Sequence, residues 1–322
     1  MKVLVFDAGI GGLNIARALR VTLPRASLTH LADGAGFPYG GRTDAALTGR
    51  VLRVVEAGLH AAGPDLVAVA CNTASTVALD ALRRRFPAVP FVGCVPPVRR
   101  AARVSRTRTI GPLATPATVR RPYLADLGRR FAADCTVLAH GAAPLASPAE
   151  AEFAGGSADP ALVSAKVEAM ARQPGGERSD AVALGCTHYA LLLPELRAAP
   201  PGGVAWLDPA DAVARQAASV AAGLVAAGLP WRGGREADGV ALHTGRPPVG
   251  RAAQAWSEAG FTRAVELAAG GPSGATAPRR AGLNGSARHP YTIPLDGVRQ
   301  VCPGTHGTRD SSSDPSSRRA RR

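Results

Sequence analysis

The sequence predicts an α/β protein made of two similar lobes, each a mainly parallel sheet flanked by helices. Short apolar runs alternate with longer helix-like segments along most of the chain, which is typical of βαβ units. In addition, two stretches share one pattern, the repeated device of this chain: an apolar strand-like run ends at a cysteine and is followed by a helix-like segment. The two stretches are "VAVACNTASTVALDAL" and "AVALGCTHYALLLPEL". At 322 residues the chain is long enough for one large core or for two domains of ordinary size.

The individual elements follow from this alternation. The candidate strands are apolar runs of a length that suits a buried parallel strand, at residues 3–7, 66–70, 91–95, 107–113, 135–140, 180–185 and 204–207. The candidate helices lie between these runs, at residues 12–23, 43–62, 75–86, 116–132 and 160–172. Parallel sheets bind ligands beyond the carboxyl ends of their strands, and Asp7, Cys71 and Cys186 all stand at such ends.

Proline-containing segments indicate where the chain passes between the lobes. "VPPV" near residue 97 and "LDPAD" near residue 208 interrupt regular structure. We therefore predict a first lobe from residues 1–97 plus 207–269 and a second lobe from residues 98–206. The remaining segment, 270–322, has few apolar residues and is predicted to be a disordered basic tail.

The net charge of +14 is concentrated in part in that tail. Nine arginines against three aspartates place six of the positive charges after residue 269, which leaves eight for the rest of the chain. A basic terminal run such as "SSRRARR" is able to contact nucleic acid or an anionic membrane, but such runs are more often solvated disorder. We expect no nucleic-acid partner apart from a weak contact through this tail.

The cysteines and the apolar runs exclude several classes of protein. Five cysteines without CxxC or Cys/His spacing predict free thiols and no metal site. No apolar run is long enough to span a membrane, and "KVLVFD" begins a strand at once, without the pattern of a signal peptide. We therefore expect a cytoplasmic protein that does not associate with membranes.

The glycines of "FDAGIGGL" form a GxGG loop between a strand and a helix. The loop lacks the spacing of a dinucleotide-binding fingerprint and the GK[ST] of a P-loop. Two interpretations stay open: a plain glycine turn, or a close approach of a ligand to backbone amides at the helix N-terminus.

The two cysteines of the repeated device are the strongest candidates for chemistry. A cysteine after an apolar strand is usually a small buried hydrophobe. Cys71 and Cys186, however, each open a helical segment, whose N-terminal partial charge favours the thiolate and lowers the pKa. Asp7 and His188 are candidates for polarising a thiol, although an aspartate there is more often a helix cap and a lone histidine more often packs.

These motifs carry a family resemblance. "FDAGIGGL", "ADGAGFPYGG", "ACNTAS", "VPPVRRAA", "LATPATV" and "LGCTHY" follow in the order seen in the glutamate racemases of the aspartate/glutamate racemase superfamily. The resemblance runs from residue 1 to about residue 260. It implies a two-lobed enzyme with its active site in the cleft between the lobes, which interconverts L- and D-glutamate without a cofactor and supplies D-glutamate for peptidoglycan.

The resemblance also assigns roles to residues. Cys71 and Cys186 become the two acid/base groups, one for each face of the α-carbon, with Asp7 assisting Cys71 and His188 assisting Cys186. Glu150 matches a glutamate beside the second base. The positions that match substrate-binding residues are Asp7, Ala8, Pro38, Tyr39, Gly40, Asn72, Thr73, Thr187 and His188. The expected partner is glutamate, and a homodimer is one option for assembly.

One departure from the family pattern leaves alternatives open. Ala8 stands where the family usually has serine, so one hydrogen bond to the substrate is expected to be missing. An alternative is therefore a related enzyme of the superfamily that acts on another amino acid or on a substituted malonate. A third alternative is a non-enzymatic protein that associates with nucleic acid through its basic tail, but such a protein would not need two matched thiols.

Overall fold

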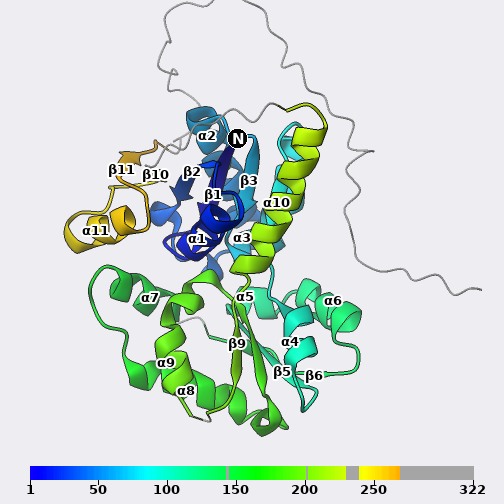
Figure 1. Ribbon diagram of the computed structural model, residues 1–322. Coiled ribbons are helices and arrows are strands. Elements are labelled where there is room, and N and C mark those ends of the chain that lie inside the picture. Colours follow the sequence, from blue (N-terminus) through cyan, green and yellow to red (C-terminus); the bar gives the residue numbers. More distant parts are fainter. Residues whose placement is uncertain (143–144, 201, 230–238, 269–322) are drawn as a thin grey trace, which may run out of the picture.

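The computed structural model describes residues 1–142, 145–200, 202–229 and 239–268, which form two parallel sheets covered by helices (Figure 1). The predicted basic tail, with Cys302, lies outside the described residues. The α/β fold class with two lobes is confirmed. No helix in the described ranges is long and apolar enough to cross a membrane.

Among the described residues, the first sheet has six strands in the order β11-β10-β2-β1-β3-β4. Their bounds are β1 Lys2–Asp7, β2 Ser27–Ala32, β3 Leu66–Val69, β4 Phe91–Gly93, β10 Val240–His243 and β11 Arg263–Glu266. Alternation along β1 divides its side chains between two cores. Val3 and Val5 pack with α1 (Gly12–Thr22), α10 (Ala210–Ala226) and α11 (Gly250–Glu258), whereas Leu4 and Phe6 pack with α2 (Asp44–Ala62) and α3 (Asn72–Arg85).

The second sheet has the order β6-β5-β8-β9, and β7 also pairs with β5. The strands are β5 Thr109–Ala114, β6 Thr136–Val137, β7 His140–Gly141, β8 Ala181–Gly185 and β9 Ala205–Leu207. The helices of this lobe are α4 Val98–Val104, α5 Pro116–Val119, α6 Pro122–Phe131, α7 Ala146–Phe153, α8 Pro160–Ala171 and α9 Leu193–Ala198. One core contains α4 and α6, and the other contains α7, α8 and α9.

Within the described ranges the chain crosses between the two sheets twice. β4 and α4 lie on either side of the first crossing, and β9 and α10 lie on either side of the second. After the second crossing α10 packs against α1 of the first lobe. The exact division at residues 97 and 207 stays a prediction.

Some predicted elements are divided or were missed. The helix expected at 116–132 is two helices, because Pro122 lacks an N–H and Arg121 before it is extended (φ −87°, ψ 140°). The strand expected at 135–140 is the two short strands β6 and β7. Three strands of the first sheet, β2, β10 and β11, were not predicted.

Candidate active site between the two lobes

The two cysteines of the repeated device stand at the ends of strands in different sheets. Cys71 separates β3 from α3, and Cys186 separates β8 from a 3₁₀ helix, Thr187–Leu192. Each cysteine is 7% exposed. The surroundings of the two thiols meet at Gly11, where an added Cβ would lie 2.9 Å from Oδ2 of Asp7 in the first lobe and 2.7 Å from Nδ1 of His188 in the second, the residue beside Cys186. One thiol from each lobe thus faces a shared region.

Burial decides the acidity of Cys71. Desolvation, followed by the charge of Asp7, raises its pKa well above the ordinary value, against a smaller lowering by the backbone N–H of Ala74. The helix N-terminus acts on this thiol in the expected direction, but burial and Asp7 outweigh it, so the net pKa of Cys71 is raised and not lowered. The helix end does contribute a donor, but a single amide does not offset the loss of water around a thiolate.

Asp7 ends β1 and is completely buried. Its Oδ2 accepts the backbone N–H of Gly12 at 2.8 Å, and within the described part of the chain its Oδ1 has no hydrogen-bond partner. Burial raises the pKa of this carboxyl, while the charge of His188 opposes the rise. Asp7 therefore interacts with Cys71 of its own lobe and with His188 of the other.

Cys186 has a different set of neighbours. Its Sγ lies 4.0 Å from Nδ1 of His188, whose Nε2 lies 2.8 Å from Oε1 of Glu150 on α7. The same Glu150 oxygen accepts the backbone N–H of Ile10 at 3.0 Å, so a second-lobe carboxylate is held by the GxGG loop of the first. Burial lowers the pKa of His188, but its bonds to Cys186 and Glu150 and the charge of Asp7 raise it, and the net pKa is well above the ordinary value.

The glycines of the GxGG loop allow this contact between lobes. A Cβ on Gly9 would overlap Oε1 of Glu150, and a Cβ on Gly11 would lie 2.6 Å from Oγ1 of Thr187 and 2.7 Å from Nδ1 of His188. The sequence suggested either a plain glycine turn or a ligand close to the loop backbone. Neither interpretation included side chains of the second lobe, which are the groups that approach Gly9 and Gly11.

The segment with Pro38, Tyr39 and Gly40 borders the same region, next to Cys71 and to Thr115. Tyr39 is buried in the same apolar cluster as Ala8 and Cys71. An added Cβ on Gly40 would touch the Cβ of Thr115, at 3.4 Å, in the second lobe. The structure thus brings this segment close to both lobes' site residues.

Hydroxyl and amide groups gather in the same region. Thr73 Oγ1 lies 3.2 Å from Oγ1 of Thr115, which lies 3.1 Å from Oγ1 of Thr118. The carboxamide of Asn72 is buried, and its polar atoms have no hydrogen-bond partner at ordinary distance in the described part of the chain, although Asn72 is near enough to Cys94 to act on that thiol. A buried group of this kind is costly unless a ligand or water satisfies it. Asn72 and these threonines can therefore bind a polar ligand.

Three residues of this region were missed from the sequence: Thr115, Thr118 and Phe37. The two threonines belong to the quoted motif "LATPATV", which contained the signal. The Phe37 ring lies 5.2 Å from the His188 ring between centroids and packs against cores of both lobes. In the described ranges there is no cluster of three or more His, Cys, Asp or Glu side chains that could hold a metal ion.

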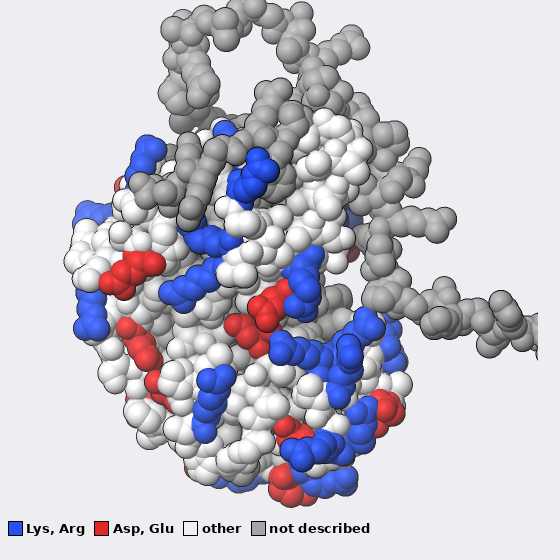
Figure 2. All heavy atoms as spheres, in the orientation of Figure 1, with Lys and Arg blue, Asp and Glu red and all other residues white. Residues whose placement is uncertain are grey.

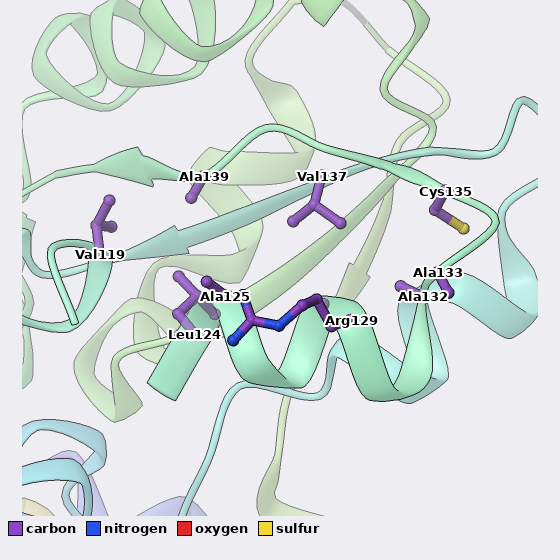
Figure 3. Close-up of a pocket in the computed structure, with 10 residues that line it drawn as sticks. Val119, Leu124, Ala125, Arg129, Ala132, Ala133, Cys135, Val137 and Ala139 are labelled. Carbon is purple, nitrogen blue, oxygen red and sulfur yellow. The ribbon is translucent and has the colours of Figure 1, made fainter. Parts of the chain in front are cut away.

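Two hollows lie outside this region. One, of about 410 Å³, is bounded by α6 and the segment with Val137 and Ala139, and Cys135 stands at its edge (Figure 3). The other, of about 780 Å³, lies where the chain crosses between lobes and includes Arg99, Arg100, Arg103 and Arg215. Basic side chains also gather on the face where Figure 1 places α4 and α6 (Figure 2). Neither hollow is lined by Cys71 or Cys186.

Comparison with known proteins decides the family. The family model described as Asp/Glu/Hydantoin racemase matches residues 14–217. The chain belongs to the Asp/Glu/hydantoin racemase family. The matched range includes both Cys71 and Cys186, and the racemase is an isomerase.

Individual members of this family are similar over most of the racemase chain. The glutamate racemase of Granulibacter bethesdensis is 52% identical over 262 residues, which cover 80% of this chain and 94% of that protein. The glutamate racemase of Brucella ovis is 44% identical over 218 residues, covering 68% and 79%.

Solved structures give the same result for the racemase fold. Escherichia coli glutamate racemase, in complex with L-glutamate and the activator UDP-MurNAc-Ala, is 34% identical with a TM-score of 0.74, covering 83% of this chain and 98% of that one. The Thermus thermophilus enzyme, in complex with β-chloro-D-alanine, is 32% identical with a TM-score of 0.62, covering 83% and 96%.

Proposed function

We propose that this racemase interconverts L- and D-glutamate without a cofactor, by proton transfer at the α-carbon between Cys71 and Cys186. The observation that carries the proposal is the placement of two buried thiols at the carboxyl ends of strands in two different sheets. Inversion requires a base on one face of the α-carbon and an acid on the other, so one thiol from each lobe meets the requirement. The similarity to glutamate racemases supports glutamate as the substrate.

The two cysteines exchange roles in each turnover. In one direction the Cys71 thiolate takes the α-proton, and the Cys186 thiol gives its proton to the opposite face. The reaction ends with a Cys71 thiol and a Cys186 thiolate, which is the pair that starts the reverse reaction. By the family resemblance, Cys71 acts on D-glutamate and Cys186 on L-glutamate.

Each thiol is assisted by its own charged neighbour. The substrate ammonium adds a positive charge to the buried surroundings of Cys71, and this charge lowers the pKa that burial had raised. On the other side, the raised pKa of His188 keeps its imidazole protonated beside Cys186, with Glu150 as its partner. A protonated imidazole stabilises a thiolate and therefore makes Cys186 a usable base.

The carbanion that forms at the α-carbon needs hydrogen-bond donors around the substrate carboxylate. Asn72, Thr73 and Thr187 supply these donors in the proposal, since all three are buried at the ends of β3 and β8. Pro38, Tyr39 and Gly40 form the adjacent wall, and Ala8 leaves one family hydrogen bond unmade. For that reason another amino acid or a substituted malonate is the alternative substrate.

The family resemblance supports a cellular role as well. The D-glutamate product would be used for peptidoglycan synthesis in the cytoplasm. A homodimer is the assembly to test first, by measuring the mass of the protein in solution.

The decisive experiment separates the two cysteines. Cys71→Ser and Cys186→Ser should each lower kcat/KM for racemisation by about 10²–10⁴-fold, the usual contribution of a positioned acid or base. Cys135→Ser is the matched control and should leave the rate unchanged, because Cys135 stands at the edge of the hollow beside α6, outside the proposed site.

Racemisation rates cannot show which cysteine serves which enantiomer. The two enantiomers have equal free energy, so kcat/KM in the two directions stays equal in every variant. Elimination from a 3-chloro analogue of each enantiomer avoids this constraint. Cys71→Ser should retain elimination from the L analogue only, and Cys186→Ser from the D analogue only. A serine variant that racemises glutamate at the wild-type rate would exclude its cysteine as a base.

A further inference from the structure

A buried carboxylate stands behind the wall formed by Tyr39 and Gly40. Asp33 follows β2 and has no exposed surface. Its Oδ2 accepts hydrogen bonds from Arg50 Nε at 2.6 Å and from the Tyr39 hydroxyl at 2.5 Å. Its Oδ1 accepts from Arg50 Nη2 at 2.6 Å and from the Thr244 hydroxyl. Four donors therefore converge on one side chain.

These donors come from segments that are distant in the sequence. Arg50 lies on α2, Tyr39 opens the 3₁₀ turn Tyr39–Gly41, and Thr244 follows β10. The backbone N–H of Asp33 donates to the carbonyl of Asp7 at 2.9 Å. Asp33 thus links the Tyr39 turn to the end of β1, where Asp7 stands.

The space around this carboxylate is filled. A Cβ on Gly36 would overlap Arg50 Nε and the Asp33 carboxylate. Tyr39 in turn packs in the apolar cluster with Ala8 and Cys71. A shift of the Asp33 network would therefore move Tyr39, and with it Gly40, relative to Cys71.

Only a carboxylate satisfies all four donors. Each oxygen of Asp33 accepts two hydrogen bonds, so both oxygens must be acceptors. An asparagine would turn an NH₂ group toward two of the donors and leave the Arg50 charge without its partner.

We propose that Asp33 is a positioning residue of the racemase, which acts through Tyr39 to hold the Tyr39–Gly41 turn where it binds the substrate. Asp33 does not touch the reacting atoms. The inference rests on the proposed function, because it takes the Tyr39–Gly41 turn as part of the glutamate site.

The test compares KM with kcat in the full chain. Asp33→Asn and Tyr39→Phe should each raise KM for glutamate about tenfold and change kcat less than about threefold, since the charge-assisted bond that holds the turn is lost while both cysteines stay. The double variant should be no worse than Asp33→Asn alone, because both changes break one connection. Arg50→Lys, which keeps the charge but loses the two-pronged contact, should show a smaller rise in KM.

Two controls separate positioning from folding and from failure of the proposed function. Arg53→Met, an exposed arginine on the same helix, should leave KM unchanged. Folded Asp33→Asn and Tyr39→Phe proteins with the wild-type KM, whatever their thermal midpoints, would overturn the inference. If wild type lacks racemase activity, or if Cys71→Ser retains it, the proposed function fails instead.

Discussion

The contact between the GxGG loop and the second lobe predicts that Gly11→Ala damages catalysis. The added Cβ would lie 2.6 Å from Thr187 Oγ1, 2.7 Å from His188 Nδ1 and 2.9 Å from Asp7 Oδ2. Gly11 has φ −55° and ψ −31°, which alanine adopts without strain, so the effect is purely steric. An ordinary contact of this kind is about 3.5 Å, and each neighbour would have to retreat by roughly 0.5–1 Å.

Two of these neighbours, Asp7 and His188, are held in place by hydrogen bonds. Asp7 Oδ2 is bonded to Gly12 at 2.8 Å, and His188 Nε2 to Glu150 at 2.8 Å. The lobes would therefore separate, or the two assisting groups would leave their cysteines. Misplacement by about 1 Å costs on the order of 100-fold in rate, and overpacking costs about 1–3 kcal/mol of stability.

The assay for Gly11→Ala is the loss of optical rotation of L- and D-glutamate, together with thermal unfolding. Gly223→Ala is the matched control, because nothing lies within 4 Å of a Cβ there and the residue is on α10. This control should keep the wild-type rate and gain roughly 0.8–1.0 kcal/mol from its higher helix propensity. A Gly11→Ala variant with wild-type kcat would refute the requirement for close contact between the lobes.

Four further outcomes are expected. Asp7→Asn should slow racemisation yet raise the thermal midpoint by about 2–4 °C, the shift that roughly 1 kcal/mol gives at this size. Burial raises the pKa of Asp7 in the folded protein, so at pH values above 3.8, its pKa in the unfolded chain, the buried carboxylate destabilises the fold. The rise in the thermal midpoint should therefore disappear in acid, and a lower midpoint at neutral pH would contradict this reasoning. Glu150→Gln should reduce kcat about tenfold, because His188 loses a charged partner; an unchanged kcat and pH profile would contradict this role. The raised pKa of Cys71 keeps its proton in place above pH 9.0, so the alkaline decline of kcat/KM should begin above that pH, and a decline well below it would be inconsistent. Ala8→Ser should increase kcat/KM for glutamate or leave it unchanged, since a bond to a charged group is worth roughly 1.5–3 kcal/mol; a loss for glutamate with activity retained on another substrate would favour the alternative substrates.

Much of the fold could be predicted because buried parallel strands are continuous apolar runs. β3 and β8 contain nothing else, and both are followed by helical residues. β2, "SLTHLA", was missed because Thr29 and His30 break its apolar run. His30 is nevertheless fully buried among the rings of Trp256 and Phe261, a packing that only the assembled lobe provides. All four residues of β11 are exposed at the sheet edge, and the strand has no apolar pattern to detect.

The candidate site could be predicted only where a residue's neighbours are local in sequence. Cys71 and Asn72 are adjacent, as are Cys186 and Thr187, so strand-to-helix turns place them. The hydrogen bonds around Asp33 include one from Thr244, which is 211 residues away in the sequence, so no local sequence pattern predicts this contact. Thr115 likewise could be assigned to the site only through its contact with Thr73 of the first lobe, which is distant in the sequence.

The GxGG loop shows how a local pattern and its cause can come from different parts of the chain. Glycine there suggested a close approach of some group to the backbone, and an approach does occur, but Glu150, Thr187 and His188 of the second lobe make it. Because the loop carries no side chains at Gly9 and Gly11, these groups come close enough for Asp7 to raise the pKa of His188 while it also raises that of Cys71. One buried carboxylate is thereby coupled to both thiols, through Cys71 directly and through His188 to Cys186. In the proposed mechanism the glycines therefore contribute to the acid/base chemistry, although they supply no functional group to it.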